Sequence, residues 1–116
     1  MMKPVIGIVG PCAAGKTTLV HRLRQAGYES RHIAQEHSYV ADMWKRLVNP
    51  DILVYLHVSY PFTNSRRKMD WTEEEYKEQL HRLRNARQNA NLCVDTDSLS
   101  PQEILDLVIQ FVDRQK

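Results

Sequence analysis

The sequence has too few cysteines for a disulfide framework, because it contains only two, Cys12 and Cys93. No apolar run approaches the roughly 18 residues of a membrane span, and the first residues lack the apolar stretch of a secretory signal. Neither sign of charge is in large excess, since 16 Lys and Arg oppose 14 Asp and Glu and leave a net charge of +2. That charge is too small to indicate nucleic-acid or membrane binding. Together these absences predict a cytoplasmic protein.

The composition is that of a globular protein. Apolar residues make up 42% of the chain and charged residues 26%, a balance that excludes a disordered or fibrous protein. A chain of 116 residues is long enough for one domain with its own core. Because no repeat and no Gly/Ser-rich linker divides the sequence, we expect a single domain over residues 1–116.

Short apolar runs alternate with segments of helical periodicity. The segments that we expect to form strands are residues 5–9, 31–34, 52–58 and 92–94. The segments with helical spacing or capping signals are residues 16–26, 39–47, 72–90 and 101–112. This alternation predicts an α/β fold, with a short and mainly parallel sheet of about four strands and helices on both faces.

One segment fits a consensus for phosphate binding. Gly10-Pro11-Cys12-Ala13-Ala14-Gly15-Lys16-Thr17 matches G-x-x-x-x-G-K-[ST]. The two glycines allow backbone turns that point successive N–H groups at an anion, and the positive end of the next helix faces the same place. We expect Lys16 to reach the β and γ phosphates of a nucleotide and the Thr17 hydroxyl to bind Mg²⁺. The expected nucleotide contacts are Gly10, Cys12, Ala13, Ala14, Gly15, Lys16, Thr17 and Thr18.

The position of this segment supports the interpretation. It lies between an expected buried strand and an expected helix, which is the context that the binding mechanism requires. The alternative is a plain glycine turn between a strand and a helix, but such a turn has no need of Gly15-Lys16-Thr17-Thr18.

With this motif the chain resembles the P-loop NTPase superfamily, and within it the small P-loop kinases of nucleosides, nucleotides and other small molecules. Residues 49–59 are similar to the strand that leads into the lid of these kinases, and residues 91–101 to their last strand and the turn beside adenine. Residues 35–38 resemble the Glu-Arg-Ser motif of deoxynucleoside kinases, with His37 in the place of the arginine. The resemblance implies a three-layer P-loop NTPase fold with ATP and Mg²⁺ as cofactors.

The resemblance also suggests a lid. Residues 59–71 are polar and basic and show no period, so we expect a mobile, lid-like loop. Family lids carry arginines at this place, and here Arg66 and Arg67 are candidates for stabilising charge on the transferred phosphoryl group. A solvated basic loop without a catalytic role is the alternative.

Glu36 is the best candidate carboxylate near the phosphate segment. It follows the expected strand at 31–34, where it could hold Mg²⁺ or accept a proton from a hydroxyl group. Its alternative role is that of an ordinary residue at a helix start. By contrast, Asp51 begins its strand and should lie at the opposite edge of the sheet, and Asp95 and Asp97 are equally explained as turn and capping residues.

Three functions remain open. The first is an ATP-dependent small-molecule kinase of reduced size, in which Lys16, Glu36, Arg66 and Arg67 carry the chemistry. The second is a nucleotide-dependent switch or slow NTPase that acts through a protein partner, because Gln35-Glu36 resembles the Gln-Glu that positions water in small GTPases. The third is a degenerate kinase domain that only binds nucleotide, with an exposed sheet edge at Ile33 that could pair with another chain or a second copy.

The segment that usually binds the acceptor is reduced here to residues 27–32, much shorter than in the kinases that the chain resembles. This departure favours a small acceptor, a partner protein or no acceptor at all. Among the remaining residues, we expect Cys93 to be a small core residue. Trp44 and Tyr39 should lie in the core or in a pocket wall rather than form a base-stacking platform.

Overall fold

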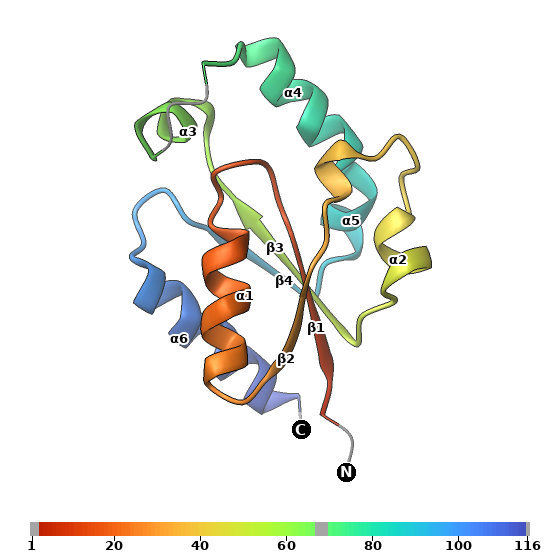
Figure 1. Ribbon diagram of the computed structural model, residues 1–116, viewed down its shortest axis with the longest axis vertical. Helices are drawn as coiled ribbons and strands as arrows, with labels where there is room; N and C mark the ends of the chain where they lie inside the picture. The colour runs from red at the N-terminus through yellow and green to blue at the C-terminus, as the bar shows by residue number, and fades with distance from the viewer. Residues whose placement is uncertain (1–2, 67–69, 116) are drawn as a thin grey trace.

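A computed structural model of the protein describes residues 3–66 and 70–115. Its centre is a sheet of four parallel strands in the order β2-β1-β3-β4 (Figure 1). The strands are β1 Val5–Val9, β2 Glu29–His32, β3 Ile52–His57 and β4 Leu92–Asp95. The expected α/β class and four-stranded parallel sheet are confirmed.

Helices cover both faces of this sheet. They are α1 Lys16–Gln25, α2 Met43–Leu47, α3 Tyr60–Arg66, α4 Glu73–Arg82, α5 Arg84–Asn89 and α6 Pro101–Arg114, with a 3₁₀ turn η1 at Gln35–His37. Residues of α1 and α6 pack on one face, and residues of α2 and α5 pack on the other. In the described ranges, no helix is long and apolar enough to cross a membrane.

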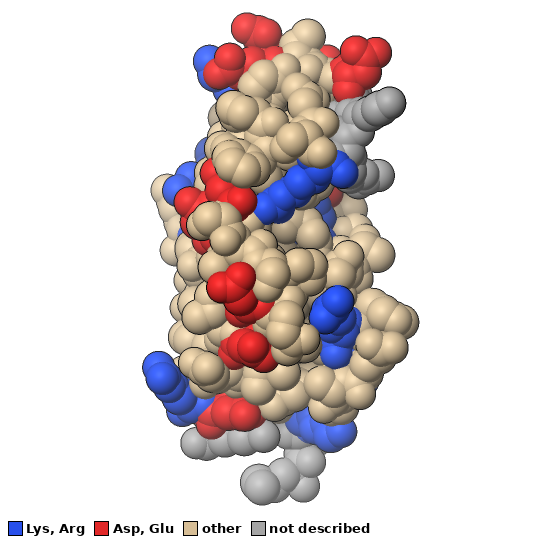
Figure 2. Space-filling model, turned by 90° about the vertical axis from the view of Figure 1, so that its left-hand side faces the viewer, with Lys and Arg blue, Asp and Glu red and all other residues tan. Residues whose placement is uncertain are grey.

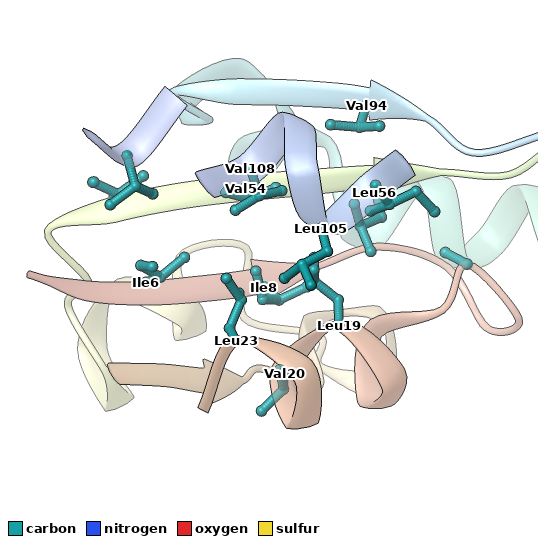
Figure 3. Packing of buried hydrophobic residues seen from close by; sticks show 14 of the residues in the cluster. Ile6, Ile8, Leu19, Val20, Leu23, Val54, Leu56, Val94, Leu105 and Val108 are labelled. Atoms are coloured by element: carbon teal, nitrogen blue, oxygen red, sulfur yellow. The ribbon is translucent and has the colours of Figure 1, made fainter. Parts of the chain in front are cut away.

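Alternation along β3 divides the core into two layers. Val54 and Leu56 face the α1 and α6 side, where Figure 3 shows them near Val108. Leu53 and Tyr55 face the other way. Each fully buried side chain of this size contributes about 1.5–3 kcal/mol relative to an exposed one. This packing anchors the central strands, whose carboxyl ends carry the site described below.

The edge strand β2 differs from its prediction. The expected strand at 31–34 is shifted, and β2 instead spans Glu29–His32. Ser30 is the residue that β2 buries, and its hydroxyl donates to the carbonyl of Val20 at 2.9 Å. The expected sheet edge beside β1 is present, because β2 is an edge strand, but Ile33 follows β2 and is buried in the second core layer rather than lying on that edge. The outer edge carries the charged pair Arg31–Glu29 at 3.6 Å, a feature that discourages pairing with another strand.

The helix expected at residues 39–47 is much shorter. Only Met43–Leu47 is helical, because Ser38 and Val40 form a turn in which the Ser38 hydroxyl accepts the Val40 N–H at 3.1 Å. Trp44 is buried as expected, and its indole N–H donates to Asn85 at 2.9 Å. Tyr39 is 86% exposed and lines neither pocket of the described residues, so the expectation that it lies in the core or in a pocket wall is wrong.

The two capping boxes are confirmed, and the long helix at 72–90 is divided. Thr72 caps α4 and Ser100 caps α6, each with the glutamate three residues on. Leu83 separates α4 from α5. Its side chain is fully buried in the second core layer, so the bend lies where the helical segment packs on the sheet.

Residues 59–71 are not a simple loop, because they contain helix α3. Thr63 holds this segment together: its hydroxyl donates to the carbonyl of Tyr60 at 2.6 Å and accepts from the Trp71 indole at 3.0 Å. Tyr60 packs against Tyr76 of α4 with tilted rings, and Trp71 packs against the same ring edge-on. The prediction of a loop is therefore wrong for residues 60–66, which are helical, and aromatic packing connects this segment to α4 (Figure 1, top).

Both cysteines are free thiols. Cys93 is exposed, so its expected place in the core is wrong. Since β4 lies at the sheet edge, Val94 is its only fully buried residue.

Candidate functional site

The segment 10–17 connects β1 to α1 and curls at the carboxyl edge of the sheet. Gly10 has φ +154°, and a Cβ there would lie 2.2 Å from the Leu56 carbonyl oxygen of β3. Gly15 has φ +97° with open space around it, so backbone conformation rather than crowding requires a glycine there. The Ala14 N–H donates to the Pro11 carbonyl at 3.2 Å and closes the turn. The loop between an expected strand and an expected helix is confirmed.

Lys16 is the centre of the site. Its ammonium nitrogen lies 2.9 Å from Glu36 Oε2, and the two side chains are only 6% and 4% exposed. The same nitrogen donates to the carbonyls of Gly10 at 2.7 Å and Pro11 at 3.0 Å. These three acceptors match the three N–H donors of the ammonium group. The loop thus encloses its own lysine, and Glu36 supplies the counter-charge.

Glu36 reaches this position through the 3₁₀ turn η1, which follows β2. The turn is held by Gln35, whose amide accepts from Trp44 N at 2.8 Å and donates to the carbonyls of Val40 at 2.9 Å and Arg82 at 3.2 Å. Glu36 Oε1 is buried and has no hydrogen-bond partner among the described residues. A buried carboxylate oxygen without a donor is unfavourable by about 1–3 kcal/mol, so this atom is available to a ligand.

Glu36 lies in the first turn of η1, as its alternative interpretation as a helix-start residue expects, and its carboxylate also reaches Lys16 of the loop.

Arg66 extends from the end of α3 to the same loop. Its guanidinium group donates to the Ala13 carbonyl at 3.3 Å, to the Thr96 hydroxyl at 2.8 Å and to the Thr96 carbonyl. Sequence analysis thus finds a residue that does lie at the site, although it belongs to a helix rather than a loop. The second candidate, Arg67, lies outside the described residues.

A cavity of about 840 Å³ opens beside the loop. It lies where the parallel strands end, the usual ligand position in open α/β sheets. Its lining residues come from the loop and α1, from β2 and η1, from the end of α3 and from the start of α6. They are Cys12, Ala13, Ala14, Gly15, Lys16, Thr17, Thr18, Leu19, His32, Glu36, His37, Arg66, Leu99, Pro101 and Ile104. Of the expected nucleotide contacts, only Gly10 is not part of this lining.

Gln79 was not among the predicted site residues. Its side chain is almost fully buried, and its carbonyl accepts the Cys12 N–H at 3.0 Å while its amide donates to Cys12 Sγ at 3.2 Å. The available signal was its spacing: Gln79 lies between Tyr76 and Leu83, two buried residues of the same helical face. A polar residue inside such a stripe indicates a buried hydrogen-bond partner.

Two histidines border the site. His37 Nε2 lies 3.9 Å from Cys12 Sγ and 3.9 Å from Glu36 Oε2. His32 lies on β2, where desolvation, followed by the positive charge of Lys16, lowers its pKa below the ordinary 6.5. The histidines of the sequence show no spacing typical of metal ligands, and His37, next to Glu36, is the one that sequence analysis singles out for function.

The remaining acidic candidates have structural roles. Asp51 accepts the Val5 N–H at 2.7 Å at the opposite edge of the sheet, as expected. Asp97 accepts the Ser59 N–H at 2.9 Å, and Asp95 accepts the Asp97 N–H at 3.1 Å. Both therefore stabilise turns, which confirms the structural interpretation.

No protein-family model and no curated protein matches the chain, so the interpretation of the site rests on its own geometry.

Proposed function

We propose that the protein binds ATP with Mg²⁺ at the loop 10–17 and transfers the γ-phosphoryl group to a small-molecule acceptor. It would thus be a small cytoplasmic kinase with a P-loop NTPase fold. The observation that carries this proposal is the buried Lys16 ammonium, enclosed by its loop at the end of β1 and open to an 840 Å³ cavity. Pockets of about 300–1,000 Å³ hold ligands of nucleotide size. Two free thiols agree with a reducing compartment.

The chemistry requires neutralised phosphate charge and a positioned hydroxyl group. Lys16 would exchange its Glu36 partner for the β and γ phosphates, and the loop N–H groups would bind the same oxygens. Thr17 and Glu36 both line the cavity and offer the oxygen ligands that Mg²⁺ prefers, and the unpartnered Glu36 Oε1 fits this role. When bound, Mg²⁺ would reduce the negative charge on the phosphates.

The transfer itself is a displacement at the γ-phosphorus. The acceptor oxygen forms the new P–O bond, the bond to the β-phosphate oxygen breaks, and ADP leaves with the electron pair. As the alternative to holding Mg²⁺, Glu36 would take up the acceptor proton. Arg66, which already touches the loop at Ala13, would stabilise charge on the moving group.

The two ends of the cavity differ in character. Leu99, Pro101 and Ile104 form an apolar border at the start of α6, which suits the adenine ring. His32 and His37 border the opposite part with Glu36. We place the acceptor there, because a hydroxyl group needs a base close to the γ-phosphate.

The hydrolytic switch has less support than the kinase. A water-positioning glutamine needs a free side-chain amide, but Gln35 uses its amide in three hydrogen bonds to protein backbone. Glu36 rather than Gln35 faces Lys16.

We also propose that nucleic acid is not a ligand. On the face that Figure 2 shows, acidic and basic residues are interspersed, and the net charge of the chain is only +2. Binding to a phosphate backbone usually requires a basic stripe or patch.

The decisive experiment measures ADP release from Mg²⁺–ATP with and without a pool of nucleosides, nucleotides, sugars and hydroxy acids. Wild type is compared with Lys16→Ala and with Lys45→Ala, a lysine on α2 outside the cavity lining. We expect acceptor-dependent ADP release that is lost in Lys16→Ala and kept in Lys45→Ala. ADP release that no acceptor stimulates would favour the slow NTPase, and ATP binding without release would favour a binding-only domain.

A further inference from the structure

Three side chains of different chemistry meet at the mouth of the cavity. Cys12 Sγ, His37 Nε2 and a carboxylate oxygen of Glu36 all lie within 4.8 Å of one another. Cys12 comes from the loop 10–17, whereas Glu36 and His37 come from the turn η1. Two separate segments thus bring together a thiol, an imidazole and a carboxylate, the three ligand types that bind Zn²⁺.

The spacing of these atoms is close to that of a metal site. Sγ and Nε2 are 3.9 Å apart, and Nε2 lies 3.9 Å from Glu36 Oε2. Ligand bonds of about 2.0–2.3 Å at tetrahedral angles put neighbouring ligand atoms roughly 3.5 Å apart. The Cys12 sulfur and the Glu36 oxygen lie within 4.8 Å of each other. Because His37 is 60% exposed, its side chain has room to move toward both, and a bound ion would also draw the sulfur and the carboxylate closer together.

Two further observations point to a ligand at this place. Glu36 Oε1 is buried and finds no hydrogen-bond partner within residues 3–66 and 70–115, although Oε2 is held by Lys16. Gln79 orients Cys12 through both its N–H and its sulfur, at 3.0 and 3.2 Å. Hydrogen bonds to a metal ligand of this kind fix its orientation in metal sites. All three candidate ligands also line the 840 Å³ cavity, which gives the ion a path of entry and an open fourth position.

We propose that Cys12, Glu36 and His37 form a binding site for Zn²⁺. The thiolate makes the site selective for Zn²⁺ over Mg²⁺, which prefers oxygen ligands. Because the site uses Glu36, Zn²⁺ bound there opposes the binding of Mg²⁺–ATP, and this consequence rests on the proposed function. Metal binding itself does not depend on it.

The test uses Co²⁺, a spectroscopic substitute for Zn²⁺, with the full chain and without nucleotide. We expect one Co²⁺ per chain, with a thiolate-to-cobalt charge-transfer band and visible bands of a four-coordinate ion, and Zn²⁺ should displace it. Cys12→Ser should abolish the charge-transfer band. His37→Gln should weaken Co²⁺ binding by about 100-fold or more. Loss of a residue that only hydrogen-bonds to a metal ligand already costs about 10–100-fold, and loss of a ligand should cost more.

Matched controls separate the site from other metal contacts. Cys93→Ser removes the other free cysteine, and His81→Gln removes a histidine of α4 that does not line the cavity; both should keep the wild-type spectrum. A thiolate band that survives in Cys12→Ser, or disappears in Cys93→Ser, overturns the proposal. Thermal unfolding of each variant, followed by circular dichroism, identifies any loss of Co²⁺ binding that is caused by unfolding.

A second measurement tests the consequence for nucleotide. The Kd for ATP is measured with and without Zn²⁺ in wild type and in Cys12→Ser. In Cys12→Ser the proposed site is lost, so any weakening of ATP binding comes only from Zn²⁺–ATP complexes in solution. We expect a larger factor in wild type, and equal factors would refute competition at Glu36. If the cobalt spectrum is absent and ATP binds normally, the metal site alone is rejected. If the cobalt spectrum is present and ATP does not bind, the proposed nucleotide function alone is rejected.

Discussion

The Lys16–Glu36 ion pair should be a major determinant of stability, because removing either partner leaves a buried charge without compensation. At the observed 2.9 Å, two unit charges attract by about 6 kcal/mol with an effective dielectric constant of about 20. Desolvation of both groups offsets much of this attraction. Breaking such a pair from one side nevertheless typically costs about 3–5 kcal/mol. We expect Lys16→Met to cost about 3 kcal/mol, the lower end of this range.

A double-mutant cycle measures the coupling. Lys16→Met, Glu36→Gln and the double variant are compared with wild type by urea unfolding, followed by circular dichroism. Because the double variant contains no unpaired charge, we expect its cost to fall short of the sum of the single costs by at least about 1.5 kcal/mol. High salt should change this coupling little, since buried pairs are screened much less than exposed ones.

The chain contains a suitable reference pair. Arg46 and Asp42 also lie 2.9 Å apart, but they are 67% and 42% exposed. Their coupling should be below about 0.5 kcal/mol and should decrease further in salt. If the Lys16–Glu36 coupling were as small as that of the exposed pair, the claim that burial makes this pair important would be refuted.

Three further predictions concern the loop, a helix cap and the cavity border. Gly10→Ala places a methyl group against the β3 backbone at positive φ, so we expect it to destabilise the protein by about 2–3 kcal/mol in urea unfolding; a loss below about 0.5 kcal/mol would contradict the clash. Hydrogen bonds from Ser100, first its backbone N–H and then its hydroxyl, lower the pKa of Glu103 below 4.5. The contribution of this group to stability is therefore complete above pH 4.5 and is lost as pH falls through the lowered pKa. In Ser100→Ala, NMR titration should find that pKa closer to 4.5, and an unchanged value would contradict the role of the hydroxyl. Desolvation and the charge of Lys16 lower the pKa of His32 below 6.5, so Lys16→Met should raise it. Since the unfolded chain binds this proton more readily, the contribution of His32 is complete above pH 6.5 and is lost as pH falls through the lower folded pKa; an imidazole titration by NMR checks both statements.

The parts of the fold that follow from local signals were predictable. The apolar runs of β1 and β3, the capping boxes at Thr72 and Ser100, and the glycine loop are each encoded within a few neighbouring residues. Where tertiary contacts decide, prediction failed. Helix α3 depends on Thr63, whose two hydrogen bonds reach Tyr60 and Trp71. The sequence between Thr63 and Trp71 has no periodic pattern, so nothing local predicts the bond between them.

The site shows the same division. Lys16 was identified by its motif, but its pairing with Glu36 depends on η1, and η1 depends on Gln35 contacts to Trp44 and Arg82. Gln79 approaches Cys12 from 67 residues away in sequence. Separations of this size leave no pattern in a single sequence, because only the packed fold brings these residues together.

The enclosed Lys16 also bears on which ligand the loop would accept. Its ammonium group already has a carboxylate and two carbonyl oxygens as partners, so a ligand gains only if it offers more than these partners do. A monoanion with one or two oxygens would bring Lys16 no more negative charge than Glu36 already supplies. It would also leave the Glu36 carboxylate buried without its partner. A polyphosphate carries several charges and oxygens, and with Mg²⁺ it brings a cation that can pair with the released Glu36. The internal ion pair therefore favours a metal-bound polyphosphate over simple anions, which supports the proposed nucleotide.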